Sequence, residues 1–194
     1  MGVCPHLNTC WQIKKSAKAL SYFMNGFLLW IKSKWDKEQV NKEDVHVTAL
    51  LKEVAVYHEE SGNKGTNTII IIADESLIAK TSKRYLEIII SNIVDNACKY
   101  TRNGTITLSA YAEENKIIIS CRDTGRGMSA EKIDSLLFQS KLDEKEQPEA
   151  YEFDSFKLGY RFINDMVKLI GAGVSITSTI NQGTEVKIIL TGLS

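Results

Sequence analysis

The sequence predicts an α+β protein: a two-layer sandwich in which a mixed β-sheet carries helices on one face and a further helix precedes it. Three observations lead to this fold class. Strand-like and helical segments follow one another neither as a regular βαβ alternation nor as an all-β series. Residues 68–73 contain four consecutive isoleucines, which indicates a buried strand. Residues 82–101 repeat apolar side chains at helical spacing, which indicates an amphipathic helix.

The composition is that of a globular protein without a charge preference. Of the 194 residues, 43% are hydrophobic and 25% are charged, and 24 basic side chains balance 24 acidic ones. This balance favours neither a nucleic-acid partner nor an acidic membrane. The longest apolar stretch, residues 19–31, is too short to span a bilayer, and no signal peptide is evident, so we expect a cytoplasmic chain.

The four cysteines predict reduced thiols rather than a disulfide framework. Cys98 and Cys121 fall in segments expected to be buried, and Cys4 and Cys10 fall near the start. Cys4 and Cys10 could form a zinc site with His6, but this pattern lacks a second pair of ligands.

Residues 1–40 are expected to form a tail and one amphipathic helix. From about residue 12 to residue 37, apolar side chains recur at intervals of three and four, with lysines off that stripe. The stripe contains Leu20, Phe23, Met24, Phe27, Trp30 and Ile31. So much aromatic surface needs a partner, which is either a second helix outside this domain or the domain itself.

Residues 41–194 are expected to form the sandwich. We expect strands at residues 45–47, 68–73, 105–112, 116–122, 174–178 and 184–190, and helices at residues 48–60, 82–101 and 160–170. The isoleucine run should be buried on both faces of the sheet. Thr48 can cap the first of these helices, and His58 falls at its polar end.

The segment from Ser91 to Thr101 carries the most informative polar residues. On a helix, Asn92, Asn96 and Lys99 lie on one stripe with Asp95, opposite the apolar stripe. The carbonyl oxygen of Asn96 can enter a Mg²⁺ shell without adding charge, and Lys99 could reach phosphates bound to that ion. The alternative is an ordinary amphipathic helix with a solvated polar face.

A second polar segment follows the strand predicted at residues 116–122. It reads Asp123-Thr124-Gly125-Arg126-Gly127-Met128, with two glycines two residues apart. Such glycines allow the backbone to turn closely against a flat ligand. Asp123 can accept a hydrogen bond from an exocyclic amine, such as that of adenine.

Together the two segments resemble the N box and first glycine box of the GHKL ATPase superfamily, which has the Bergerat fold. The resemblance is specifically to the ATP-binding catalytic domain of two-component sensor histidine kinases, and it runs from about Val45 to Leu190. Asn-x-x-x-Asn-Ala-x-Lys-Tyr-Thr followed about 27 residues later by Asp-x-Gly-x-Gly-Met is far more specific than a lone glycine-rich loop.

The resemblance implies ATP and Mg²⁺ as cofactors. It implies catalytic roles for Asn92, Asn96 and Lys99, with Asn96 as the metal ligand. It implies nucleotide contacts from Tyr100, Asp123, Gly125, Gly127, Met128, Lys157, Leu158, Gly159 and Thr184. The turn at Gly183-Thr184 resembles the one that closes the adenine pocket in the family.

The lid region departs from the family pattern. Ser129 can cap a short helix ending at Leu137-Phe138, which resembles the F box. Residues 139–156, polar and aperiodic, take the position of the ATP lid.

Of the second glycine box, Gly-x-Gly-Leu-Gly-Leu, residues 155–160 retain only Leu158 and Gly159, and Gly159 is expected to begin the next helix. Lys157 either supplies charge to the phosphates or marks a lid that binds nucleotide poorly.

The resemblance implies transfer of the γ-phosphoryl group of Mg-ATP to a histidine in two-component signal transduction. ATP-hydrolysing relatives carry a glutamate at the position of Asn92, and this glutamate takes a proton from the attacking water. Asn92 cannot do so. The family's phosphoacceptor histidine is usually followed by an acidic residue and a downstream Pro-Leu, and none of His6, His46 and His58 fits this pattern. The acceptor is therefore expected on a phosphotransfer helix of the same or a partner chain, with a response regulator downstream.

On this interpretation the helix at residues 12–37 is the second helix of the dimerisation hairpin, through which the chain could form a homodimer, and the parent sensor can be anchored in a membrane. One alternative is a degenerate nucleotide-binding or protein-interaction module without kinase activity. The other is a serine kinase of the anti-sigma type.

Overall fold

The computed structural model describes residues 40–60, 65–142 and 155–191, together with Met24, Leu28 and Ile31. These three residues are helical, in agreement with the helix expected there, and the rest of residues 12–37 lies outside the described part of the chain. Across the described ranges, no helix combines the length and the apolar character needed to cross a membrane.

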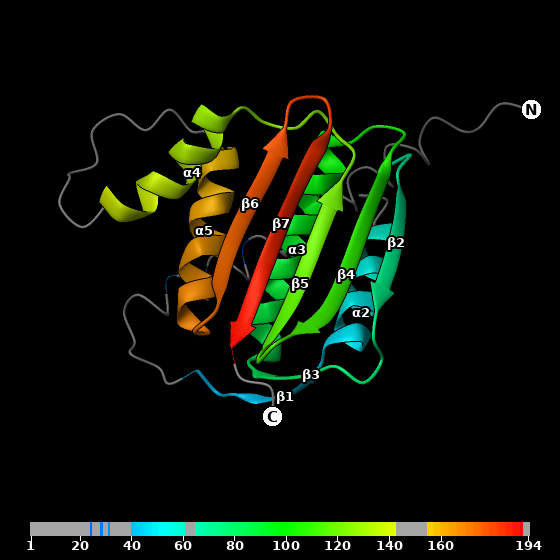
Figure 1. Ribbon diagram of the computed structural model, residues 1–194, viewed down its shortest axis with the longest axis vertical. Coiled ribbons are helices and arrows are strands. Elements are labelled where there is room, and N and C mark those ends of the chain that lie inside the picture. The colour runs from blue at the N-terminus through cyan, green and yellow to red at the C-terminus, as the bar shows by residue number, and fades with distance from the viewer. Residues whose placement is uncertain are drawn as a thin grey trace, which may run out of the picture.

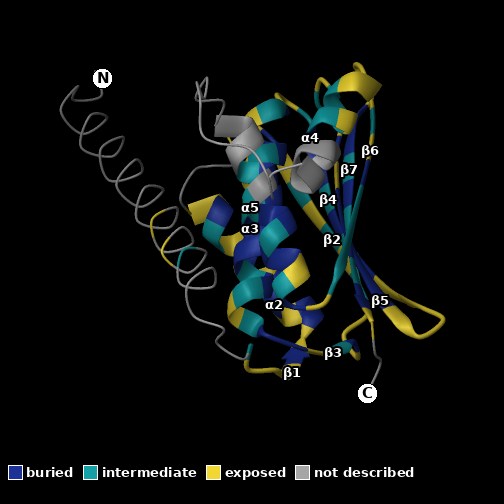
Figure 2. Cartoon of the chain, turned by 90° about the vertical axis from the view of Figure 1, so that its left-hand side faces the viewer, coloured by how far each residue is buried: buried dark blue, intermediate teal, exposed yellow. Residues whose placement is uncertain are grey.

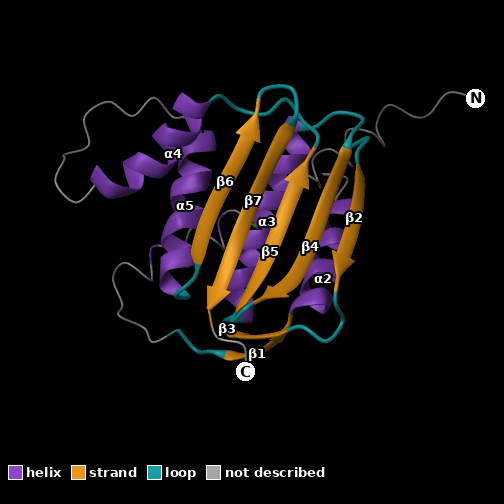
Figure 3. Cartoon of the chain, in the orientation of Figure 1, coloured by secondary structure: helices purple, strands orange, loops and turns teal. Residues whose placement is uncertain are grey.

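The described chain forms the predicted two-layer sandwich (Figure 1). The elements are β1 (Glu43–His46), α2 (Val47–Glu60), β2 (Thr68–Ala73), β3 (Ile78–Thr81), α3 (Lys83–Tyr100), β4 (Thr105–Glu113), β5 (Lys116–Asp123), α4 (Ala130–Leu142), α5 (Ser155–Leu169), β6 (Gly173–Thr179) and β7 (Gly183–Thr191). One sheet has the order β2-β4-β5-β7-β6, in which β2 and β4 are parallel and the other pairs antiparallel. Figure 3 shows α2, α3 and α5 together on one face of this sheet.

The core lies between the sheet and the helices, where Figure 2 shows the buried residues gathered. Leu86, Ile89 and Ile93 recur along α3 at helical spacing and are fully or almost fully buried. Leu108 of β4 and Ile119 of β5 are buried as well. Because each such side chain contributes about 1.5–3 kcal/mol on burial, rotating α3 about its axis would be costly. The polar stripe of α3 is therefore fixed in direction by the apolar one.

The isoleucine run is not buried on both faces, so this prediction was wrong. β2 is an edge strand, and only one face of the sheet carries helices. Ile69 and Ile71 pack against the core, whereas Ile70 and Ile72 are 42% and 62% exposed. A run of isoleucines fits a fully covered strand, but strand order decides whether both faces are covered.

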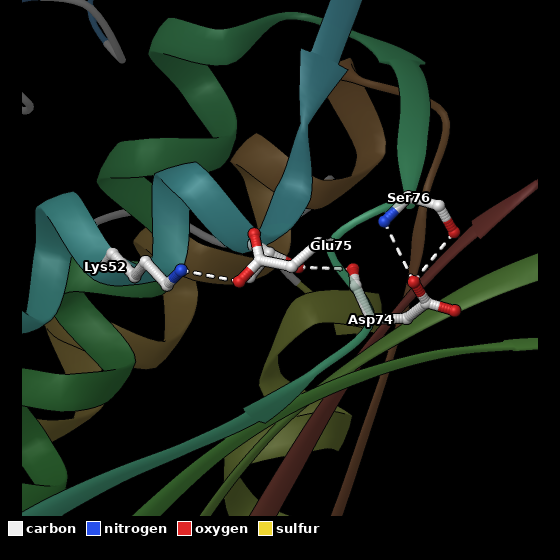
Figure 4. A network of polar contacts seen from close by, with 5 residues as sticks. Lys52, Asp74, Glu75 and Ser76 are labelled. Atoms are coloured by element: carbon white, nitrogen blue, oxygen red, sulfur yellow. Dashed lines mark hydrogen bonds and ion pairs between the residues drawn. The ribbon is translucent and has the colours of Figure 1, made fainter.

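The connection between β2 and α3 contains β3, a short strand that was not predicted and that pairs with β1. Thr48 lies inside α2 rather than at its cap, and its hydroxyl donates to the Asp74 carbonyl at 2.5 Å. Figure 4 shows Asp74 accepting two hydrogen bonds from Ser76, beside the Lys52–Glu75 ion pair. These contacts tie the β2–β3 turn to α2, although exposed ion pairs contribute little to stability.

His58 lies in the core instead of at a polar helix end, which corrects the sequence prediction. Its side chain is 1% exposed, and its Nε2 lies 3.0 Å from the Ser91 hydroxyl on α3. Burial lowers the pKa of His58 to about 4, because the charged imidazolium loses its hydration, and the contact with Ser91 opposes this only in part. The imidazole is therefore neutral in the folded protein at physiological pH.

Replacing His58 with glutamine should flatten the pH dependence of stability in acid. Between pH 6.5 and pH 4 the unfolded chain gains a proton on His58 that the folded chain does not, so the folded state loses stability as the pH falls through this window. The loss attributable to His58 amounts to about 3 kcal/mol. Urea unfolding from pH 4 to pH 7 measures it.

The control for this experiment is Ser91→Ala, which removes the hydrogen-bond partner but keeps the buried imidazole. Its stability curve should retain the wild-type slope. Parallel curves for wild type and His58→Gln would show that His58 does not carry the acid sensitivity.

Candidate functional site

A cavity of about 390 Å³ lies between α3, the C-terminal end of β5 and the β6–β7 turn. Figure 1 shows the end of β5 and the β6–β7 turn at the same end of the sheet. The cavity is lined by six of the residues that the sequence singled out, namely Asn96, Tyr100, Asp123, Gly127, Met128 and Thr184. Asn96 of the polar stripe of α3 thus meets the glycine turn after β5, beside Ile93 and Ala97 of the apolar stripe.

Backbone hydrogen bonds hold the glycine turn against both neighbours. The amide of Arg126 donates to the carbonyl of Tyr100, the last residue of α3, at 3.3 Å. The carbonyl of Arg126 accepts from the amide of Asn181 in the β6–β7 turn at 2.8 Å. The amide of Met128 donates to the Ser178 hydroxyl at 2.8 Å. The turn is therefore anchored on two sides.

This anchoring leaves no room for side chains at the glycines. Gly127 has φ +63°, and a Cβ there would overlap the carbonyl of Thr179. A Cβ on Gly125 would lie 2.5 Å from the carbonyl oxygen of Tyr100. Gly125 does not itself line the cavity, but it lets the turn approach α3.

Asp123 lines the cavity and is 7% exposed. Burial raises the pKa of its carboxyl, and the hydrogen bond from the Gly125 amide, 2.7 Å long, opposes that rise. Ile93, Ala97 and Val186 supply an apolar surface beside it. A flat apolar group bearing an amine fits these neighbours.

Asn96 lies where α3 faces α5. Its side chain is half-buried, and a Cβ placed on Gly159 would lie 3.9 Å from its amide nitrogen. Among the residues of the described ranges, no three His, Cys, Asp or Glu side chains cluster to hold a metal. A metal ion at Asn96 would therefore depend on one carboxamide oxygen and on oxygens of a ligand, which is compatible with Mg²⁺.

Asn92 and Lys99 do not line the cavity. The side-chain amide of Asn92 donates to the carbonyl of Ile88 on its own helix at 2.7 Å. Lys99 is exposed, with its ammonium nitrogen 5.4 Å from the centre of the Tyr100 ring. Their expected catalytic roles stay predictions.

Residues 81–192, more than half of the chain, match the family described as histidine kinase-, DNA gyrase B-, and HSP90-like ATPases. The chain belongs to this ATPase family. It is 25% identical over 190 residues to the sensor histidine kinase AtsR of Burkholderia thailandensis, covering 95% of this chain and 31% of AtsR. It is 27% identical over 183 residues to the autoinducer 2 sensor kinase/phosphatase LuxQ of Vibrio harveyi, covering 90% of this chain and 21% of LuxQ. The chain thus spans a third or less of these relatives.

Solved structures of histidine kinases share the fold. The Acinetobacter baumannii histidine kinase AdeS superposes with a TM-score of 0.71 at 14% identity, covering 100% of this chain and 88% of AdeS. The catalytic domain of the histidine kinase ThkA gives a TM-score of 0.64 at 18% identity, covering 78% of this chain and 95% of ThkA. These likenesses confirm the predicted α+β architecture of the ATPase domain.

The second glycine box of this ATPase domain is helical, which corrects two predictions. α5 begins at Ser155, so Gly159 lies within the helix and does not begin it. Ser155 and Lys157 stand where the family pattern has glycines. Each glycine inside a helix would destabilise it by about 1 kcal/mol, so these two residues favour a longer helix. Residues 139–156 are also helical at both ends, since α4 continues to Leu142. The remainder, residues 143–154, lies outside the described chain, as do the side chains of Leu137, Phe138, Lys157 and Leu158.

Sequence reasoning did not include Arg126, Lys132 and Tyr160 in the site, yet all three line the cavity. Arg126 stands between the two glycines of the ATPase motif, so its place in the turn was visible but the direction of its side chain was not. Burial raises the pKa of both Tyr160 and Cys121, which keeps these cavity residues neutral. The charged groups in the described wall are therefore Asp123, Arg126 and Lys132.

Gly127→Ala should destabilise the domain more than Gly65→Ala does. Both glycines have positive φ, at +63° and +59°, but nothing lies within 4 Å of a Cβ at Gly65. Gly65→Ala should therefore lower the free energy of unfolding by about 1 kcal/mol, through backbone strain alone. Gly127→Ala adds the overlap with Thr179 and should lower it by about 3 kcal/mol.

Urea denaturation of the two variants measures this difference. Equal destabilisation would mean that the turn can move away from β6 without loss, and that the close approach at Gly127 is not required.

Proposed function

We propose that this chain is the ATP-binding catalytic domain of a sensor histidine kinase, and that it transfers the γ-phosphoryl group of Mg-ATP to a histidine outside this chain. The observation that carries the proposal is that Asp123 and Asn96 line the same cavity. One is an acceptor for an amine, and the other is an uncharged oxygen ligand for Mg²⁺. The sensor histidine kinases among its relatives support the proposal, as does a structural neighbour, ShkA, solved in complex with AMPPNP.

The base is proposed to bind at the Asp123 end. The apolar surface beside this carboxylate suits the faces of a purine, and a volume of about 390 Å³ is within the usual range of small-ligand sites. Thr184 closes the same end from β7, with its hydroxyl 2.9 Å from that of Ser178. Adenine brings its exocyclic amine to this end, where guanine would bring a carbonyl oxygen against the carboxylate.

The phosphates are proposed to lie toward Asn96. Asn96 would hold Mg²⁺ together with phosphate oxygens and water, and Lys99 is proposed to contact the phosphates from the exposed side of α3. Mg²⁺ supplies charge neutralisation on the transferred group when it is bound with ATP. The chain itself contributes position, because the apolar stripe of α3 fixes where the Asn96 carboxamide lies.

Asn92 favours transfer to a protein acceptor over hydrolysis. A carboxamide cannot act as a general base toward water, and its NH₂ group already donates to the Ile88 carbonyl. A kinase benefits from an asparagine in place of a glutamate at this position, because hydrolysis would consume ATP without phosphorylating the acceptor. We propose that the acceptor histidine lies on a phosphotransfer helix of the same or a partner chain, and that a response regulator receives the phosphoryl group next.

Residues 1–40 are proposed to contribute the second helix of the dimerisation hairpin, ahead of the catalytic domain at residues 41–194, and the domain is proposed to act in the cytoplasm.

One observation favours a second candidate function, a degenerate nucleotide-binding module. Because α5 begins at Ser155, Gly159 has its amide inside the helix and not among the free amides of a helix start. Fewer glycine-box amides are then available to the phosphates than the family pattern implies.

Binding of a fluorescent ATP analogue, titrated with and without Mg²⁺, separates these two functions. Wild type should bind more tightly with Mg²⁺, and Asn96→Ala should lose about tenfold in affinity only when Mg²⁺ is present, since it removes the metal ligand. Asn115→Ala, in the exposed β4–β5 turn, is the matched control and should bind like wild type. Absence of binding by wild type would favour the degenerate module.

Phosphoryl transfer is tested by joining the chain to a phosphotransfer hairpin that carries a histidine and supplying radiolabelled ATP. Acid-labile phosphohistidine should form on the hairpin, and Asn96→Ala should reduce its rate at least tenfold, because positioning and charge neutralisation dominate this chemistry. Acid-stable phosphoserine on a protein substrate would instead support the anti-sigma type of kinase.

A further inference from the structure

Two cations stand beside the ring of Tyr100, and they differ in their relation to the cavity. The guanidinium carbon of Arg126 lies 4.5 Å from the ring centre, and the Lys99 nitrogen lies 5.4 Å from it. Both side chains are exposed. Only Arg126, together with Tyr100 itself, belongs to the cavity wall.

Arg126 lies at the Asp123 end of the cavity. It follows Asp123 by three residues, and its carbonyl accepts a hydrogen bond from the amide of Asn181 in the β6–β7 turn, which lines the cavity together with Thr184. Asn96 precedes Tyr100 by four residues, about 6 Å along α3, and faces Gly159 of α5. Arg126 is therefore placed with the residues proposed to receive the base, not with those proposed to receive Mg²⁺.

The chemistry of the pair suits a flat ring. A guanidinium group is planar and weakly hydrated, so it stacks on aromatic faces, whereas an ammonium group acts as a hydrated point charge. The backbone of Arg126 is fixed by its hydrogen bonds to Tyr100 and Asn181, and the Tyr100 ring supports the guanidinium from one side. Little conformational freedom of the backbone is left to be lost when a ligand binds.

We infer that Arg126, supported by Tyr100, contacts the base of the bound nucleotide at the cavity mouth and sets its preference for a purine. This inference rests on the proposed function, because it names the base-contacting residue of the same site. Of the two cations beside Tyr100, Arg126 then contacts the base and Lys99 contacts the phosphates.

The test compares the affinities of adenosine, ATP and CTP for the chain, measured by calorimetry. Arg126→Ala should lower the affinity for adenosine and for ATP alike, by about fivefold, because the lost stacking does not involve phosphates. The preference for ATP over CTP should shrink by a similar factor. Lys99→Ala is the matched control, because it also removes one positive charge beside the same ring. It should lower the affinity for ATP and leave the affinity for adenosine unchanged.

Arg126→Lys keeps the charge and loses the planar group, so it should bind adenosine about as weakly as Arg126→Ala. Full recovery by lysine, weakening of ATP without weakening of adenosine, or wild-type affinities in Arg126→Ala would each overturn the inference. None of these results affects the proposed function. In this experiment the proposed function fails only if wild type binds neither adenosine nor ATP, an outcome that would overturn both.

Discussion

The contact between the glycine turn after β5 and the end of α3 is the constraint on which the cavity depends. The Arg126 amide reaches the Tyr100 carbonyl only because Gly125 has no side chain to hold the two backbones apart, and Gly127 in the same way lets the turn approach Thr179 of β6. The same turn is bonded to the β6–β7 turn, so three elements distant in sequence converge on one space. Burial of Asp123, the position of Arg126 and the approach of Asn96 to the same cavity all follow from this packing.

The charged groups of the cavity wall differ in their exposure. The carboxyl of Asp123 is buried, whereas Arg126 is exposed and Lys132 is half-buried. The end of α3 would add negative partial charge, because helix C-termini expose carbonyls. Here those carbonyls have partners: Asn67 donates to the Thr101 carbonyl at 2.9 Å, and Arg126 donates to that of Tyr100. A ligand in the cavity therefore does not meet bare carbonyl oxygens from Tyr100 or Thr101.

Much of this arrangement was readable from the sequence, for identifiable reasons. The period of apolar residues predicted which stripe of α3 is buried, and it left Asn96 outside that stripe, where its side chain lines the cavity. The spacing of Gly125 and Gly127 after an apolar strand predicted a close backbone approach. These features depend on local sequence, which is why a single chain was enough to find them.

The errors concern features that depend on the assembled fold. The exposure of Ile70 and Ile72 follows from the position of β2 at the sheet edge, which its own residues do not encode. His58 resembles a surface residue until α3 brings Ser91 against it. The start of α5 at Ser155 reflects helix propensity prevailing over a motif whose glycines are absent. Arg126 was visible in the motif, but its role required knowing that Tyr100 lies beside it.

The strand order has a consequence for how the domain is made. β7, the last strand in the chain order, lies inside the sheet between β5 and β6. During synthesis, β5 thus has an open edge, and β6 has no neighbour, until residues 183–191 have left the ribosome. Because domains fold as cooperative units, most of the chain waits for this last segment before the sheet can close. Thr184 and Val186 arrive with it, so the cavity is completed in the same late step as the core.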